Sequence, residues 1–201
     1  MKQIIILLLT ANILFAQIGT ETLRKIQNKF NTISDFTASF IQYDCTSSMK
    51  NSSAIQGKIL YKKKNKFIVE LKNQVIISNG EIIWNYNKKQ KQVIISNLND
   101  EPNTYSIEKI IYNYPSLCNI RYLKKELDED VIELLPKEGM LDIKNIKIWK
   151  DKNDFISKLE ITDIGDMCYR IHFKDILINQ NITDSKFTFN PPKGIHIVDL
   201  R

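Results

Sequence analysis

The 201-residue chain has little of the residue types on which catalytic and metal sites depend. It contains three cysteines and two histidines, and the cysteines at 45, 118 and 168 are too far apart for a zinc site. GxSxG, HExxH, GxGxxG and CxxC motifs and a Walker loop are all absent. An acidic run such as 128–130 is typical of a solvated turn. We therefore predict a protein that is not an enzyme, with no catalytic residue, no metal site and no cofactor.

Arginine is scarce as well. The formal net charge is +6, but 25 of the 29 basic residues are lysines. Arginine is the side chain that binds phosphate through a planar pair of donors, so its near absence weakens the case for nucleic-acid binding. We predict no nucleic-acid partner.

The one long apolar run lies at the amino terminus. Ile4–Leu9 follows Lys2, and Leu14, Phe15 and Ala16 precede Gln17, which is typical of a secretory signal peptide. The run is shorter than the ~20 apolar residues that span a bilayer. We predict a signal peptide at 1–16, a mature domain at 17–201 and a periplasmic location.

Three cysteines cannot form a disulfide framework, because one is left over in any pairing. Either all three are small buried apolar residues, or Cys45 pairs with Cys118 or Cys168 in an oxidising compartment. The sequence leaves both possibilities open.

Apolar spacing predicts one amphipathic helix followed by many short strands. Leu23, Ile26 and Phe30 recur at helical intervals between Thr20 and Ile33, and Thr20 is a suitable N-cap. A second short helix is predicted at 103–114, ended by Pro115. Alternating or β-branched runs joined by turn signals such as Asn79-Gly80 indicate antiparallel strands. The runs are 36–43, 57–61, 66–71, 74–78, 81–86, 90–96, 119–126, 130–136, 143–150, 157–162, 169–177 and 186–189.

We expect about ten to eleven strands in a single, mainly β domain with no βαβ rhythm and no parallel sheet. Such a sheet must curl into a barrel or pack against another layer. The pattern does not distinguish a filled interior from a hollow apolar one.

Four segments together resemble the outer-membrane lipoprotein carrier (LolA) family. The likeness runs in order from the first helix to the end of the chain and is looser between 97 and 182. The segments are FTASFIQ at 36–42, GKILYKKKNKF at 57–67, ISNGEIIWNYN at 77–87 and KFTFNPPKGIHIVD at 186–199.

The resemblance implies an incomplete antiparallel β-barrel with a helical lid around an apolar cavity. It implies a monomeric periplasmic chaperone with acylated lipoproteins as cargo, an inner-membrane ATP-driven release complex and an outer-membrane acceptor as partners. Lys63 stands where the family has a lid-holding arginine, and a solvated hairpin tip is the alternative for it. The residues expected to line the acyl-chain cavity, with ordinary core packing as their alternative, are Phe40, Leu60, Phe67, Val69, Trp84, Tyr86, Ile107 and Ile111.

Two other functions fit the same architecture. One is a periplasmic module that senses lipid or lipoprotein and regulates a membrane partner. The other is a general lipid or glycolipid shuttle. Sensor modules are usually fused to a second domain or a membrane span, which favours the carrier.

Overall fold

The computed structural model describes the backbone of residues 2–45, 54–100 and 106–201, and the side chains from Gln17 onward. The side chains of the predicted signal peptide lie outside this range. The chain divides into two compact units, and each is described by itself. Unit 1 comprises Met1–Thr32, Asp44–Ser52 and Lys109–His172, and unit 2 comprises Ile33–Tyr43, Ser53–Glu108 and Phe173–Arg201. Among the described residues, none of the helices combines the length and the apolar character that crossing a membrane requires.

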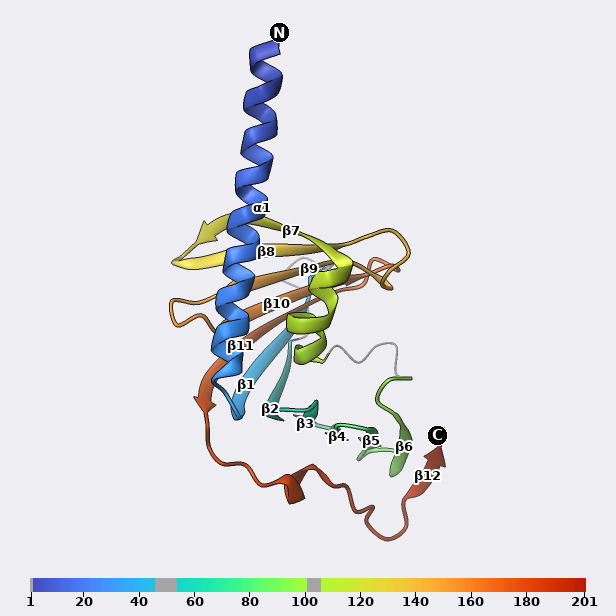
Figure 1. Cartoon of the computed structure of the whole chain (residues 1–201). Coiled ribbons are helices and arrows are strands. Elements are labelled where there is room, and N and C mark those ends of the chain that lie inside the picture. Colours follow the sequence, from blue (N-terminus) through green and yellow to red (C-terminus); the bar gives the residue numbers. More distant parts are fainter. Residues whose placement is uncertain (1, 46–53, 101–105) are drawn as a thin grey trace. The chain divides into compact units, whose positions relative to one another are not determined.

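Within the described residues, twelve strands belong to one hydrogen-bonded sheet, in the order β12-β6-β5-β4-β3-β2-β1-β11-β10-β9-β8-β7, and Figure 1 labels them. This confirms the predicted fold class, a mainly β chain whose antiparallel sheet does not close into a full barrel and which carries helices. The elements are α1 (Lys2–Asn31), β1 (Asp35–Asp44), β2 (Ile55–Lys62), β3 (Lys66–Leu71), β4 (Gln74–Asn79), β5 (Ile82–Asn87), β6 (Gln92–Asn97), η1 (Lys109–Asn113), η2 (Tyr114–Leu117), β7 (Cys118–Glu126), β8 (Glu129–Pro136), β9 (Ile143–Lys150), β10 (Ile156–Asp163), β11 (Cys168–Ile178), η3 (Asp184–Phe187) and β12 (His196–Asp199).

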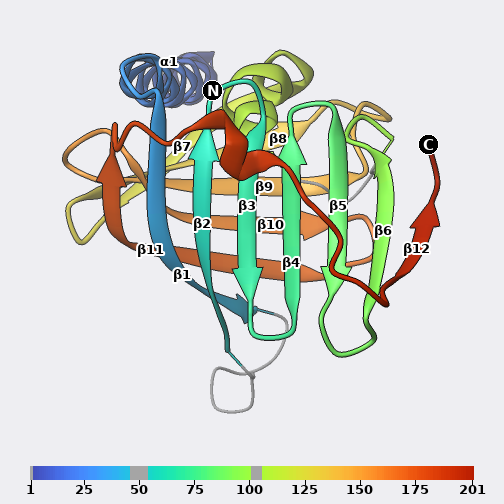
Figure 2. The same cartoon turned by 90° about the horizontal axis from the view of Figure 1, so that it is seen from below.

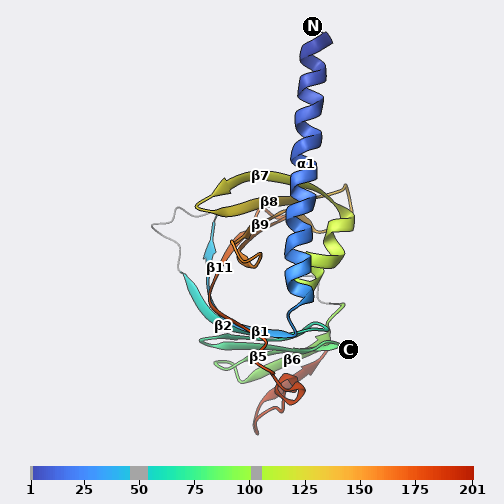
Figure 3. The ribbon, with the colours of Figure 1, turned by 60° about the vertical axis from the view of Figure 1, so that its left-hand side comes forward.

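In unit 1, helix α1 packs on β7 and β8. The contact is close at Gly19, where a Cβ atom would lie 2.9 Å from the backbone nitrogen of Tyr122. Farther along the helix, the ring of Phe30 stacks on that of Phe155 with centroids 5.1 Å apart. The η1–η2 turn lies beside α1 (Figure 3), and Gln27 Nε2 donates a 2.9 Å hydrogen bond to the carbonyl of Ile111. These contacts fix the helix and the turn on one another.

In unit 2, strands β1 to β6 form an antiparallel meander, and the chain after β11 returns across β2 to β6 (Figure 2). We call residues 179–195 the C-terminal segment. It leads into β12, which pairs with β6 in parallel, from His196 opposite Gln92 to Asp199 opposite Ile95.

Several local predictions are wrong. Helix α1 begins at Lys2, so Thr20 lies inside it and is not its cap, because the apolar residues before Thr20 continue the helix. Of the strand predicted at 186–189, residues 186–187 belong to the 3-10 turn η3 and 188–189 belong to no strand, whereas a strand not predicted, β12, adds one parallel pair with β6. The predicted second helix begins outside the described residues and continues as the π-helical turn η1, and Pro115 lies inside η2, which begins at Tyr114, instead of ending a helix.

Candidate functional site

Cross-strand register separates the side chains of unit 2 into two faces, because successive residues of a strand point to opposite sides. Phe67 lies opposite Tyr61 and Ser78, and Ser78 lies opposite Ile83. We call this side the Phe67 face. Its neighbours along each strand form the other side, which we call the Trp84 face. There Ile68 lies opposite Leu60 and Ile77, and Ile77 lies opposite Trp84.

The C-terminal segment covers the Trp84 face. Ile182 and Phe187 form one buried cluster with Ile68 and Ile77, and Leu60, Val75, Trp84 and Phe189 pack around it. The rings of Tyr86 and Phe189 lie 5.4 Å apart. The aromatic residues of this face are therefore partnered by the protein's own chain.

Charged groups anchor the C-terminal segment at its start. The carboxylate of Asp184 lies 2.6 Å from Lys62 Nζ and 2.7 Å from Lys66 Nζ. Hydrogen bonds from these two lysines lower the pKa of Asp184 to about 2. Buried Asp35 accepts hydrogen bonds from the backbone N–H groups of Gln180 and Ile182, at 2.7 and 3.2 Å. These charged contacts and the apolar cluster together hold the C-terminal segment on the sheet.

The Phe67 face carries a row of half-buried aliphatic side chains. Val69 lies opposite Ile59 and Ile76, and Asn85 lies between Ile76 and Ile94 in the same row. All five are partly exposed. They contrast with Phe67, Ile83 and Leu98, which form a buried cluster against which Val69 and Ile76 pack. We call Ile59, Val69, Ile76 and Ile94 the aliphatic row; Asn85, whose amide oxygen accepts a 2.7 Å hydrogen bond from Gln74 Nε2, interrupts it at β5. The aliphatic row leaves part of its apolar surface exposed, although Val69 and Ile76 also pack on the buried cluster.

Phe40 lies on the same face, directly opposite Gly57. A Cβ atom at Gly57 would lie 2.4 Å from Cζ of the Phe40 ring. The glycine therefore leaves the space into which the ring lies flat on the sheet.

A hydrogen-bonded cluster ties residues 106–108 to the β2–β3 hairpin. Glu108 accepts a 2.5 Å hydrogen bond from the Tyr61 hydroxyl and a 3.2 Å bond from the backbone N–H of Asn65. The hydroxyl of buried Ser106 donates to Asn65 Oδ1 at 2.5 Å. These bonds position Ile107, which is buried.

The residues predicted to line one cavity do not share one surface. Phe40, Phe67 and Val69 lie on the Phe67 face, whereas Leu60, Trp84 and Tyr86 lie on the Trp84 face under the C-terminal segment. Ile107 is buried in unit 2 and Ile111 in unit 1. Lys63 is exposed at the β2–β3 turn, where its backbone N–H donates to the carbonyl of Ser34.

Sequence reasoning missed Ile59, Ile76 and Ile94. The signal was present, because all three alternate with residues of the other face. The three residues were missed because the prediction favoured large aromatic side chains over aliphatic ones.

The sheet of unit 1 carries an ionic row. Arg121 and Glu133 lie 2.6 Å apart, and Glu160 lies between Lys147 at 2.8 Å and Arg170 at 2.5 Å. Burial raises the pKa of Glu160, but hydrogen bonds from its two basic neighbours outweigh burial and the net shift is downward. The charged groups of this row are therefore paired with one another.

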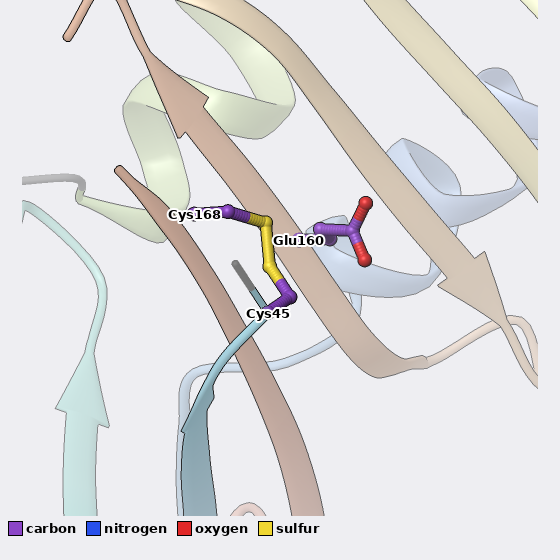
Figure 4. A group of neighbouring side chains, drawn as sticks. All are labelled: Cys45, Glu160 and Cys168. Carbon is purple, nitrogen blue, oxygen red and sulfur yellow. A yellow bond between two sulfur atoms is a disulfide. The ribbon is translucent and has the colours of Figure 1, made fainter. Parts of the chain in front are cut away.

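A disulfide joins Cys45 to Cys168, which settles the pairing that the sequence left open (Figure 4). Glu160 lies beside it, close enough to suggest a metal-binding cluster. Both sulfur atoms are consumed by the disulfide, so the cluster lacks the thiolate ligands that a metal would need. Elsewhere in unit 1, a groove of about 910 Å³ lies between α1 and Asp130 of β8. Its lining includes Glu21 and Lys25, so it is unsuited to an acyl chain.

Known proteins of one family match this sequence over nearly its whole length. The family model described as outer membrane lipoprotein carrier protein LolA matches residues 31–190. An outer-membrane lipoprotein carrier protein of Francisella philomiragia is 27% identical, covering 99% of this chain and 98% of its own. One of Klebsiella pneumoniae is 26% identical, covering 96% and 95%.

Solved structures support the fold. An uncharacterised conserved protein of Thermus thermophilus superposes with a TM-score of 0.58 at 11% identity, covering 90% of this chain and 98% of its own. A DUF1329 family protein of Desulfovibrio piger superposes with a TM-score of 0.51 at 10% identity, covering 87% and 97%.

Proposed function

Because the chain belongs to the LolA family of outer membrane lipoprotein carrier proteins, we propose that it is a periplasmic chaperone for lipoproteins. In this proposal it binds the acyl chains of lipoproteins released from the inner membrane and carries them to the outer membrane. It takes cargo as a monomer from an ATP-driven release complex in the inner membrane, delivers it to an outer-membrane acceptor and catalyses no reaction. Residues 1–16 serve as the export signal.

The observation that carries the proposal is the aliphatic row. It runs from β2 to β6, with Asn85 of β5 as the polar position between Ile76 and Ile94, and the four strand spacings of ~4.8 Å span roughly 19 Å. One acyl chain fills about half of a ~30 Å hydrocarbon core, so the row is long enough to lie along a single chain. Each CH₂ group removed from water contributes about 0.8 kcal/mol, so an acyl chain needs an extended apolar surface to cross water.

We assign the acyl contact to the Phe67 face. Phe40, Phe67 and Val69 from the predicted set then act together with Ile59, Ile76 and Ile94, and Ile107 and Ile111 act as apolar support. Leu60, Trp84 and Tyr86 hold the C-terminal segment instead, since cargo would have to displace that segment to reach them. Lys63 carries the positive charge of the family's lid-holding position at an exposed turn.

Depletion of the protein in its host tests the carrier role. Lipoproteins are expected to accumulate in the inner-membrane fraction, and unchanged fractionation would contradict the proposal. Two variants of β3 then locate the site, Val69→Asn on the Phe67 face and Glu70→Asn at the adjacent, exposed position. Only Glu70→Asn should restore transport. A general lipid shuttle would instead leave lipoprotein fractionation unchanged while the purified protein still extracts free phospholipid.

A further inference from the structure

The native disulfide joins the first and third cysteines of the chain. Cys45 and Cys168 are 123 residues apart, and Cys118 lies 73 residues after the first and 50 before the second. Cys118 is a free thiol, buried at the start of β7. The protein therefore reaches a non-consecutive bridge although a competing thiol lies between its two ends.

Chain statistics favour the wrong bridges. The probability that two points of an unfolded chain meet falls as the 3/2 power of their separation, which weights the three possible loops roughly 1 to 2.2 to 3.9 in favour of the shorter ones. The native bridge closes the longest loop, so only about one first-formed bridge in seven is native. During export Cys118 also emerges before Cys168, which adds to the same bias.

The wrong bridges cannot persist in the folded sheet. Cys118 lies on β7 and Cys168 on β11, which are separated by β8, β9 and β10. Four strand spacings amount to roughly 19 Å along the sheet. Cysteines can be bridged only when their Cα atoms lie within about 7 Å, as the 5.2 Å of the native pair allows. A bridge to Cys118 therefore blocks the sheet of unit 1 until it is broken.

We infer that the native bridge forms mainly by thiol–disulfide exchange from bridges to Cys118, which makes this chain a substrate for a thiol–disulfide isomerase. The inference rests on the proposed export to an oxidising compartment. First, a disulfide oxidant takes two electrons and two protons from Cys45 and Cys118 and is reduced to two thiols. The thiolate of Cys168 then attacks the sulfur of Cys45, the Cys45–Cys118 bond breaks, and Cys118 leaves as a thiolate that takes up the proton lost by Cys168. No further oxidant is consumed. An isomerase supplies the attacking thiolate where Cys168 cannot reach, and is regenerated.

Folding makes the exchange one-way. Cys118 is 6% exposed once β7 is in place. Its burial raises the pKa of the thiol, and the nearby Lys137 ammonium offsets this only in part. A buried, protonated thiol is a poor nucleophile, so Cys118 does not attack the native bridge again.

Oxidative refolding of the reduced, unfolded chain tests the inference. Refolding is started with oxidised glutathione alone, samples are blocked with N-ethylmaleimide, and bridged peptides are identified by mass spectrometry. Bridges to Cys118 should exceed the native bridge about six to one at the start. They should convert to Cys45–Cys168 when reduced glutathione or a protein disulfide isomerase is added.

Cys118→Ala is the matched variant. It should form Cys45–Cys168 directly, at a rate that isomerase does not change. Equal rates for the wild type and the variant, or a native bridge that dominates from the first sample, would overturn the inference. If Cys118→Ala folds poorly, Cys118→Ser provides the same comparison. The readout is the pattern of bridges alone, so failure here leaves the lipoprotein test unaffected.

Discussion

Substituting Phe187 by alanine removes the centre of the cluster beneath the C-terminal segment. The side chain is 1% exposed and packs with Ile68, Ile77 and Ile182. Deleting a buried phenylalanine ring costs about 3–5 kcal/mol, which combines the lost transfer energy with that of the cavity left behind. The free energy of unfolding, measured by urea denaturation, should fall by that amount. Phe189→Ala should cost less, because Phe189 is half-buried.

The same Phe187→Ala variant should still bind acyl chains when it is assayed without urea and at low temperature, where it remains folded. The reason is that the cluster lies on the Trp84 face, whereas the aliphatic row lies on the Phe67 face. Uptake of a fluorescent fatty-acyl probe, measured beside the urea curve, separates the two effects. A loss below 1 kcal/mol, or a loss of probe binding while the variant remains folded, would refute the assignment of the two faces.

Three further outcomes follow from single side chains. Leu127 is 90% exposed with φ +47° in the two-residue β7–β8 turn, so Leu127→Asn should raise the free energy of unfolding by about 1 kcal/mol in urea denaturation. The pKa of Asp184 is depressed from 3.8 to about 2 by Lys62 and Lys66. Its contribution to the free energy of unfolding is therefore present above pH 3.8 and is lost as the pH falls toward 2. In acid unfolding curves, Asp184→Asn should lose less stability than the wild type between these two pH values. Gly57→Ala drives a methyl group into the Phe40 ring and should lower the melting temperature, while Gly139→Ala, where a Cβ atom meets nothing within 4 Å but φ is +70°, should lower it less.

Strand periodicity predicted most of the sheet, because each strand alternates between a buried and a more open side. Runs such as Lys66–Leu71 and Ile143–Lys150 coincide with β3 and β9. The period-2 alternation of the strands puts Trp84 on one face with Tyr86 and Phe67 on the other with Val69, as the cross-strand register does. It could not say what covers each group, because the C-terminal segment that packs on Trp84 is about a hundred residues away in the chain.

Other features depend on contacts that leave no local pattern. β12 has four residues, too few to show an alternating pattern, and it is a strand because it pairs with β6. The choice of Cys168 over Cys118 as the partner of Cys45 follows from strand order, which places β11 next to β1 and β7 at the edge of the sheet. The Asn79-Gly80 turn was predicted one residue early, because Asn79 closes the turn with its side chain, which accepts from the backbone N–H groups of Glu81 and Ile82.

Site-specific photo-crosslinking to a synthetic triacylated lipopeptide tests the central claim most directly. A photoreactive residue is placed at Val69 on the aliphatic row or at Trp84 on the opposite face, in protein purified from periplasmic extract. The account predicts a one-to-one adduct from position 69, none from position 84, and no adduct with the same peptide lacking acyl chains. An adduct only from position 84, or none from either position, would contradict it.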